Sequence, residues 1–183
     1  MSLATGCRIG VIVVGHGQMP YDLTPEIKYR YMRLKFKAER TEDEEKTFKQ
    51  LEDTILNWPR NALNDPYASS LHNIAEELKR IGVFNAVWVA FNEFCKPTLR
   101  EAIENACQSD VDVIVVVTTM TTRGGDHAER EIPAIMEAAK QKCSKTLIYA
   151  WPFDVTEVAQ LLAKTVNYHL HKKFLTPDNI QNT

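Results

Sequence analysis

The amino-acid sequence predicts an α/β protein in which a four-stranded parallel sheet has helices on both faces. Four runs of apolar, often β-branched residues recur along the chain, as expected of strands that are covered on both faces. Amphipathic helical patterns separate these runs, and this alternation is typical of parallel sheets. The length of 183 residues and the apolar content of 44% fit a single domain, residues 1–183, with one core.

The first strand is predicted at Ile9–Val14 and leads into Gly15-His16-Gly17. The two glycines allow a tight turn and leave the imidazole unobstructed, because glycine has no Cβ atom. The patterns of nucleotide-binding loops, G-x-x-x-x-G-K-[ST] and G-x-G-x-x-G, are absent, so no nucleotide is expected. A histidine here is either a structural residue or a ligand, and this segment alone does not distinguish the two.

Residues 18–64 form a long excursion in which we expect a helical hairpin laid over the sheet edge. Thr24-Pro25 begins one helix with an N-cap and a proline in the first turn, and Thr41 with Glu44 forms a capping box that begins the second. A row of cations in the first helix is interpreted as a solvated face, and the alternative is contact with a polyanionic ligand. These cations are Lys28, Arg30, Arg33, Lys35 and Lys37, with Arg40 just beyond the helix.

Two helices flank the second predicted strand, Ala86–Phe91. Asp65-Pro66 begins a helix that stops at Gly82, and Pro97 begins the helix that follows the strand. Glu93 lies between the strand and Pro97, so it occupies a strand's carboxyl end, as His16 does.

The third predicted strand, Val111–Val117, leads through a polar loop into a helix with His127 near its start. Asp126 is expected to cap this helix in a capping box with Glu129. Pro133 would clash with the carbonyl four residues before it in a regular helix. The pattern therefore leaves two alternatives, a main helix that restarts near Pro133 or one helix that is kinked there.

The fourth strand is predicted at Lys145–Trp151, and Asp154 is expected to cap a last helix. The tail from Thr176 onward is polar and expected to be frayed. The residues of the last helix that should form a buried stripe are Val155, Val158, Ala159, Leu162 and Val166.

The four cysteines are widely spaced and form no C-x-x-C pair, so they support neither a zinc motif nor a redox motif. We expect reduced and mostly buried thiols at Cys7, Cys95, Cys107 and Cys143. Cys95, near a strand end, is a weak candidate for a soft metal ligand.

Charge and hydropathy exclude several classes of partner. The net charge of -2 provides no broad basic field, which argues against nucleic acid. There is no run of about 18 apolar residues and no pattern of an export signal, so we expect no membrane insertion and a cytoplasmic protein.

The carboxyl ends of parallel strands lie along one edge of the sheet, where ligands bind in folds of this kind. That edge should gather His16, Glu93, His127 and Glu131, the last two sharing a helix face because they are four residues apart. Two imidazoles with one or two carboxylates suit cobalt, iron or nickel with open coordination positions, and they also suit proton transfer. The residue pattern alone therefore predicts a metal-binding or acid-base site on a flavodoxin-like sheet.

The segments at three strand ends resemble those of the small sirohydrochlorin chelatases of the CbiX type, relatives of ferrochelatase. The motifs are Val-Gly-His-Gly, Ala-Phe-Asn-Glu followed by Pro97, and Gly-Asp-His-Ala-Glu-Arg-Glu-Ile-Pro. The resemblance covers most of the chain except residues 18–64, which look like the lid-like N-terminal segment of ferrochelatases. Two positions differ from the family pattern: Glu131 stands where the family has Asp, and Thr118–Arg123 replaces Pro-x-Phe-Leu.

This resemblance implies that His16 and His127 bind the metal and that Glu93 assists. The chain would be half of a two-domain chelatase, so two chains would pair as a homodimer. The activity would be ATP-independent insertion of Co²⁺, Fe²⁺ or Ni²⁺ into sirohydrochlorin or a related precursor, as in cobalamin or siroheme biosynthesis. Because sirohydrochlorin has many carboxylates, Arg123, Lys96 and the cations of the insertion would hold its rim.

Two other functions are considered. A module of the same fold could bind a tetrapyrrole or a metal without turnover, and it would show stoichiometric binding and no rate above background. A metal-dependent hydrolase would need more carboxylate ligands or a His-x-x-x-His pair, and these strand ends have neither.

Overall fold

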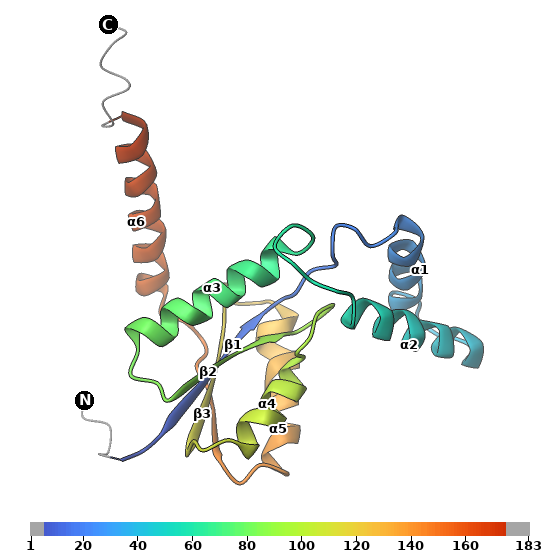
Figure 1. Ribbon diagram of the computed structural model, residues 1–183, viewed down its shortest axis with the longest axis horizontal. Helices are drawn as coiled ribbons and strands as arrows, with labels where there is room; N and C mark the ends of the chain where they lie inside the picture. Colours follow the sequence, from blue (N-terminus) through green and yellow to red (C-terminus); the bar gives the residue numbers. More distant parts are fainter. Residues whose placement is uncertain (1–5, 175–183) are drawn as a thin grey trace, which may run out of the picture. The chain divides into compact units, whose positions relative to one another are not determined.

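The computed structural model describes residues 6–174 and contains one parallel sheet (Figure 1). Its strands pair in the order β2-β1-β3-β4, and every pairing is parallel. The strands are β1 (Ile9–Gly15), β2 (Ala86–Phe91), β3 (Val113–Thr118) and β4 (Thr146–Tyr149). The predicted four-stranded parallel sheet is confirmed, although β4 is shorter than the expected Lys145–Trp151.

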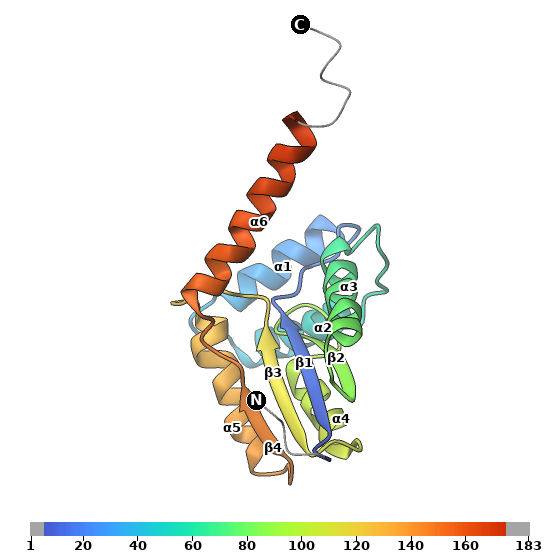
Figure 2. The same ribbon diagram turned by 90° about the vertical axis from the view of Figure 1, so that its left-hand side faces the viewer.

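Helices cover both faces of this sheet, as predicted (Figure 2). The central strand β1 alternates its contacts, because successive side chains of a strand point to opposite faces. Ile12 and Val14 pack in the cluster that contains α4 (Leu99–Gln108) and α5 (Ile132–Lys140). Ile9, Val11 and Val13 pack in the cluster that contains α3 (Pro66–Ile81). All of β1 is buried, so the residue that follows it is held at a rigid point of the molecule.

Most of the predicted helix starts are confirmed. Thr24 caps α1 (Pro25–Lys35), Thr41 and Glu44 form the capping box of α2 (Glu42–Leu56), and Asp65 caps α3. The start of α4 differs from the prediction, because Thr98 caps the helix through its own capping box with Glu101. Pro97 thus lies outside the helix that it was expected to begin.

The helices α1 and α2 form the predicted hairpin and have a small core of their own. Its buried members are Leu23, Tyr31 and Ile55, and Phe94 from the loop after β2 packs against them. Both views place α1 beyond the carboxyl ends of the strands (Figures 1 and 2). The insertion therefore lies on the side of the sheet edge where the predicted site residues are.

Arg60 joins the insertion to the loops and the helix around it. Its Nη1 donates to the carbonyl of Gln18 at 2.7 Å and to Asp65 Oδ2 at 2.5 Å, and its Nη2 donates to the carbonyls of Ile55 and Phe94. The Arg60 side chain is 14% exposed and that of Asp65 is fully buried. One guanidinium group thus fixes the loop after β1, the end of α2, the start of α3 and the loop after β2.

The chain divides into two compact units, one up to Trp151 and one from Pro152 onward. The single domain expected from the sequence therefore stays a prediction. The second unit contains α6 (Val155–Phe174), in which no side chain is buried, so the predicted buried stripe is wrong. Helical spacing identifies the side chains that share a face, but it does not specify what covers that face. The predicted frayed tail lies outside the described residues.

The expectation of reduced thiols is also wrong for two of the four cysteines. Cys107 and Cys143 form a disulfide, with their Cα atoms 5.7 Å apart, whereas Cys7 and Cys95 are free. The two bonded residues lie at the end of α4 and just after α5, two helices that pack on the same face of the sheet. Their separation of 36 residues gave no indication of this proximity, which comes from tertiary packing.

We expect Asp65→Ala to lower the free energy of unfolding by about 3–5 kcal/mol, because it leaves the buried Arg60 charge without its partner and removes a helix cap. Urea denaturation followed by circular dichroism measures this loss. Thr41→Ala is the matched control, since it removes an exposed cap with no buried ion pair and should cost only about 1 kcal/mol. Equal losses in the two variants would contradict the role given to the Arg60–Asp65 pair.

Candidate metal site

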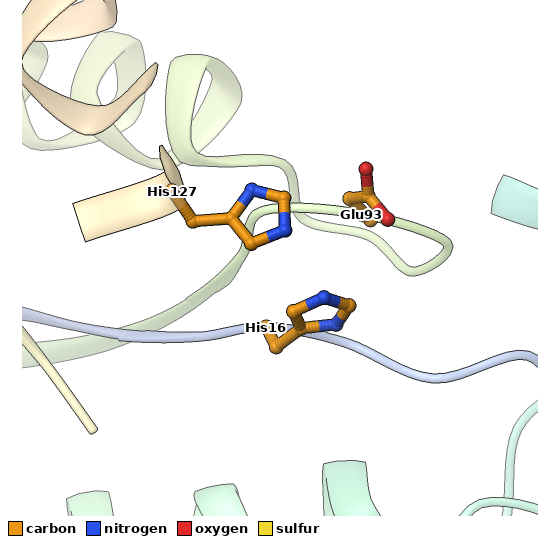
Figure 3. A group of neighbouring side chains, drawn as sticks. All are labelled: His16, Glu93 and His127. Atoms are coloured by element: carbon orange, nitrogen blue, oxygen red, sulfur yellow. The ribbon is translucent and has the colours of Figure 1, made fainter. Parts of the chain in front are cut away.

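The structure brings together three of the predicted residues. One ligand atom from each of His16, Glu93 and His127 can be chosen so that all three atoms lie within 4.8 Å of one another. The three side chains converge from three separate segments (Figure 3). Among residues 6–174, no other group of histidine, cysteine and carboxylate side chains has this proximity. Each of the three is partly buried, so the group is open to solvent on one side.

His16 is positioned by one hydrogen bond from its backbone and one from its ring. Its N–H donates to the hydroxyl of Tyr67 at 2.8 Å, and its Nδ1 lies 2.8 Å from the carbonyl of Gly17. A carbonyl can only accept, so we assign the ring proton to Nδ1. The Nε2 atom of His16 therefore keeps its lone pair, which is the form in which imidazole binds a metal.

The loops after β1 and β2 run side by side beyond the ends of the strands. The N–H of Asn92 donates to the carbonyl of Gly15 at 2.9 Å, and the N–H of Glu93 donates to the carbonyl of His16 at 2.8 Å. Gly17 has φ +92°, and a Cβ atom built on it would lie 1.9 Å from the carbonyl oxygen of Glu93. Glycine is therefore required here both for the backbone conformation and for the close approach of the two loops.

His127 begins a single π-helical turn, His127–Glu131, which precedes α5. The N–H of Ile132 bonds to the carbonyl of His127, five residues back, and Pro133 falls in the first turn of α5, where no N–H is needed. Of the two alternatives predicted for this segment, the restart near Pro133 is confirmed. The expected Asp126 cap is wrong: Asp126 is itself helical and pairs with Arg130.

Glu129, the other half of the expected capping box, instead bonds to the loop before the turn. It accepts from the N–H of Gly124 at 3.1 Å and pairs with Arg123 at 3.3 Å. The hydroxyl of Tyr149 donates to the carbonyl of Ala128 at 2.9 Å, and burial raises the pKa of this tyrosine to about 12. β4 thereby helps to hold the turn that presents His127.

Glu131 fixes the orientation of the His127 ring. Its Oε2 lies 2.9 Å from His127 Nδ1 and accepts from Asn92 Nδ2 at 2.7 Å. Partial burial raises the pKa of Glu131, but the hydrogen bonds from His127 and Asn92 outweigh this and hold the pKa below its usual value. Asn92 Nδ2 also lies 2.7 Å from His127 Nδ1. We assign the ring proton to Nδ1, because the ionised Glu131 carboxylate beside it can only accept, and Nε2 of His127 is then available to a metal.

The two predicted rim cations do not belong to this three-residue group. Lys96 pairs with Glu101 at 3.7 Å, and Arg123 pairs with Glu129. Cys95 is buried and donates to the carbonyl of Lys96, so it is not part of the group either. His72 is also outside it and has its ring beside that of Phe91.

The CbiX family model matches residues 63–168 of the chain, which is more than half of its length. The chain belongs to the CbiX family. Two relatives, both named sirohydrochlorin cobaltochelatase, come from Methanopyrus kandleri and from Saccharolobus islandicus strain L.S.2.15. The first is 40% identical over 72 residues, 39% of this chain and 50% of the relative. The second is 35% identical over 108 residues, 55% of this chain and 82% of the relative.

A crystal structure of a CbiX protein of cobalamin biosynthesis from Marinobacter aquaeolei VT8 has the same fold. The likeness has a TM-score of 0.55 at 16% identity and covers 90% of this chain and 98% of the other. The family match begins at residue 63, so Glu93 and His127 of this CbiX chain lie inside it, whereas His16 and the helices α1 and α2 lie before it. No helix among the described residues is long and apolar enough to span a membrane.

Three residues that shape the site of this CbiX chain were not predicted from the sequence. Asn92 belongs to one of the family motifs, but no role was predicted for it. Tyr149 comes from the edge strand, and Lys35 was interpreted as part of a solvated helix face. Lys35 Nζ in fact forms an ion pair with Glu93 Oε1 and lies 4.8 Å from the centre of the Phe94 ring. Their roles depend on contacts between distant segments, which no local pattern encodes.

We expect Gly17→Ala to lower the free energy of unfolding by about 3 kcal/mol or more, because the added Cβ must displace the Glu93 backbone as well as adopt a left-handed conformation. Gly124→Ala is the matched control, since Gly124 has φ +88° and nothing within 4 Å of an added Cβ. It should lose only about 1–2 kcal/mol. Urea denaturation compares the two, and a loss at Gly17 no larger than that at Gly124 would contradict the close approach.

Proposed function

We propose that this chain inserts a divalent metal ion into sirohydrochlorin or a related tetrapyrrole without using ATP. Co²⁺ is the first candidate, because the relatives named above are cobaltochelatases, and Fe²⁺ and Ni²⁺ are the alternatives. The proposal is carried by one observation, the convergence of two available imidazole Nε2 atoms and the Glu93 carboxylate at the open sheet edge.

These three ligands suit a metal ion that is a substrate and must be released to the macrocycle. Two neutral imidazoles and a carboxylate bind borderline divalent ions and leave positions open for water or for the nitrogens of the macrocycle. His16 and His127 would hold the metal, with their ring centres 4.6 Å apart and nearly perpendicular. Such a geometry brings the metal and the macrocycle together without enclosing the metal completely.

Insertion also requires bases. Two protons leave the inner nitrogens of the macrocycle as the metal forms its bonds to them, and a group at the site has to accept these protons. Glu93 lies close enough to both imidazoles to take this part, accepting one proton at a time and releasing it to the solvent that reaches the partly buried site. Lys96 and Arg123, with side chains 42% and 71% exposed, would exchange their present carboxylate partners for carboxylates on the rim of the substrate.

An anaerobic absorbance assay with sirohydrochlorin and Co²⁺ tests this function. We expect His127→Ala to lower the insertion rate by about 100-fold or more, because it removes a metal ligand. His72→Ala is the control, since its ring lies against Phe91 outside the site and its loss should leave the rate unchanged. Stoichiometric binding with no rate above background would instead support a non-catalytic binding module.

We also propose that two chains pair. The support for this is the resemblance to half of a two-domain chelatase and the exposed apolar side chains on α6, where Val155, Leu162 and Val166 are 79%, 61% and 57% exposed. These three positions share one helical face, because their spacing is seven and four residues.

Light scattering coupled to size-exclusion chromatography should give twice the 20.9 kDa mass of one chain. We expect Leu162→Glu to give the single-chain mass, because a charge on this face opposes its burial against a second copy. Lys164→Glu, a change of charge on the same helix at a polar position, should leave the dimer intact. A wild-type protein with the mass of one chain would contradict the pairing.

A further inference from the structure

The insertion contributes a cation directly to the candidate metal site. Lys35, the last residue of α1, pairs with Glu93 across 58 residues of sequence. Both side chains are largely withdrawn from solvent, at 23% and 19% exposure. The lysine is further held by its position over the Phe94 ring. This pair therefore differs from the exposed ion pairs elsewhere on the surface, and one of its partners is a proposed metal ligand.

We infer that Lys35 sets the metal affinity of the His16–Glu93–His127 site by competing with the metal for Glu93, an inference that rests on the proposed metal site. A carboxylate that is paired with an ammonium group attracts a dication less, and the ammonium repels that dication directly. Because Lys35 holds Oε1, the metal has to displace this lysine before Glu93 can bind it through both oxygens. The site is thereby weakened without any change in its ligands.

A cavity beside the pair gives the displaced ammonium a place to go. It has a volume of about 510 Å³, and its charged lining consists of Lys35, Glu93, a second carboxylate, Glu52, from α2, and a second cation, Arg100, from α4. When Glu93 turns toward a metal, Lys35 exchanges Glu93 for Glu52 across this space. Lys35 can thus pair with either of two carboxylates, Glu93 or Glu52.

Weak binding is what a substrate metal needs, because an ion held too firmly is not passed to the macrocycle. Lys35 belongs to α1, which lies before the region that matches the CbiX family model, so this competition comes from the insertion and not from the matched region. Lys35 is a specificity-determining residue in this sense, since it favours ions that bind well to the two imidazoles alone over ions that depend on the carboxylate.

Titration with Co²⁺, followed by calorimetry and by the visible absorption of the bound ion, tests this inference. We expect Lys35→Met to bind Co²⁺ about ten-fold more tightly than the wild type, because the competing charge is removed. Lys35→Arg keeps the charge and should stay close to the wild type. Glu52→Gln should bind Co²⁺ more weakly, since Lys35 then has no second carboxylate in the cavity.

Lys37→Met is the matched control. Lys37 lies two residues beyond Lys35 and pairs with Glu44 at 2.5 Å, so this variant removes the same charge from the same end of the insertion without touching Glu93. It should bind Co²⁺ as the wild type does. If Lys35→Met and Lys37→Met have the same affinity as the wild type, the inference is overturned.

The titration of His127→Ala separates this inference from the proposed function. Equal Co²⁺ binding by the wild type and His127→Ala would contradict the proposed metal site itself. Binding that depends on His127 but not on Lys35 would leave the metal site in place and reject only the competition. Thermal unfolding of each variant, monitored by circular dichroism, verifies that each affinity is measured on folded protein.

Discussion

The guanidinium group of Arg60 joins four segments of the chain, two of them distant in sequence, and the geometry of the site depends on it. Its donors reach the carbonyls of Gln18 and Phe94, which lie in the loops after β1 and β2. These are the loops that hold His16 and Glu93. The same group neutralises the fully buried carboxylate of Asp65, which in turn caps α3. A buried charge of this kind is tolerated only because nearly all of its donors are used, so the position of one side chain constrains the others.

The sheet and the three metal-site residues could be predicted from the sequence for a common physical reason. Strands buried on both faces are continuous apolar runs, and their carboxyl ends have to lie on one edge, so His16, Glu93 and His127 were expected near one another before any contact was known. Helix caps such as Thr41 and Asp65 were also predictable, because a cap bonds to residues only three positions away.

Most of the other features of the fold and the site could not be predicted, because they depend on contacts between distant segments. Asn92 bonds to Glu131 across 39 residues, and Tyr149 supports the backbone of Ala128 from another strand. The failure at Asp126 has a local cause: this residue has helical backbone angles, whereas a residue that caps a helix lies outside it. In α6, the periodicity correctly indicates an apolar face, but burial depends on a partner surface that the periodicity does not specify.

The π-helical turn also limits how this part of the chain can vary in length. It holds one residue more per turn than the regular helix that follows, and Pro133 fixes the point at which that helix begins. Removing one residue between His127 and Pro133 would let the turn close as a regular helix, because the bond from Ile132 to His127 would then span four residues, and the histidine would keep roughly its direction about the helix axis. Removing a second residue, from what is then a regular helix, would rotate the histidine by about 100° about that axis, away from its two companions. The segment can therefore lose the extra residue of the π-helical turn, whereas any further deletion would separate the imidazoles.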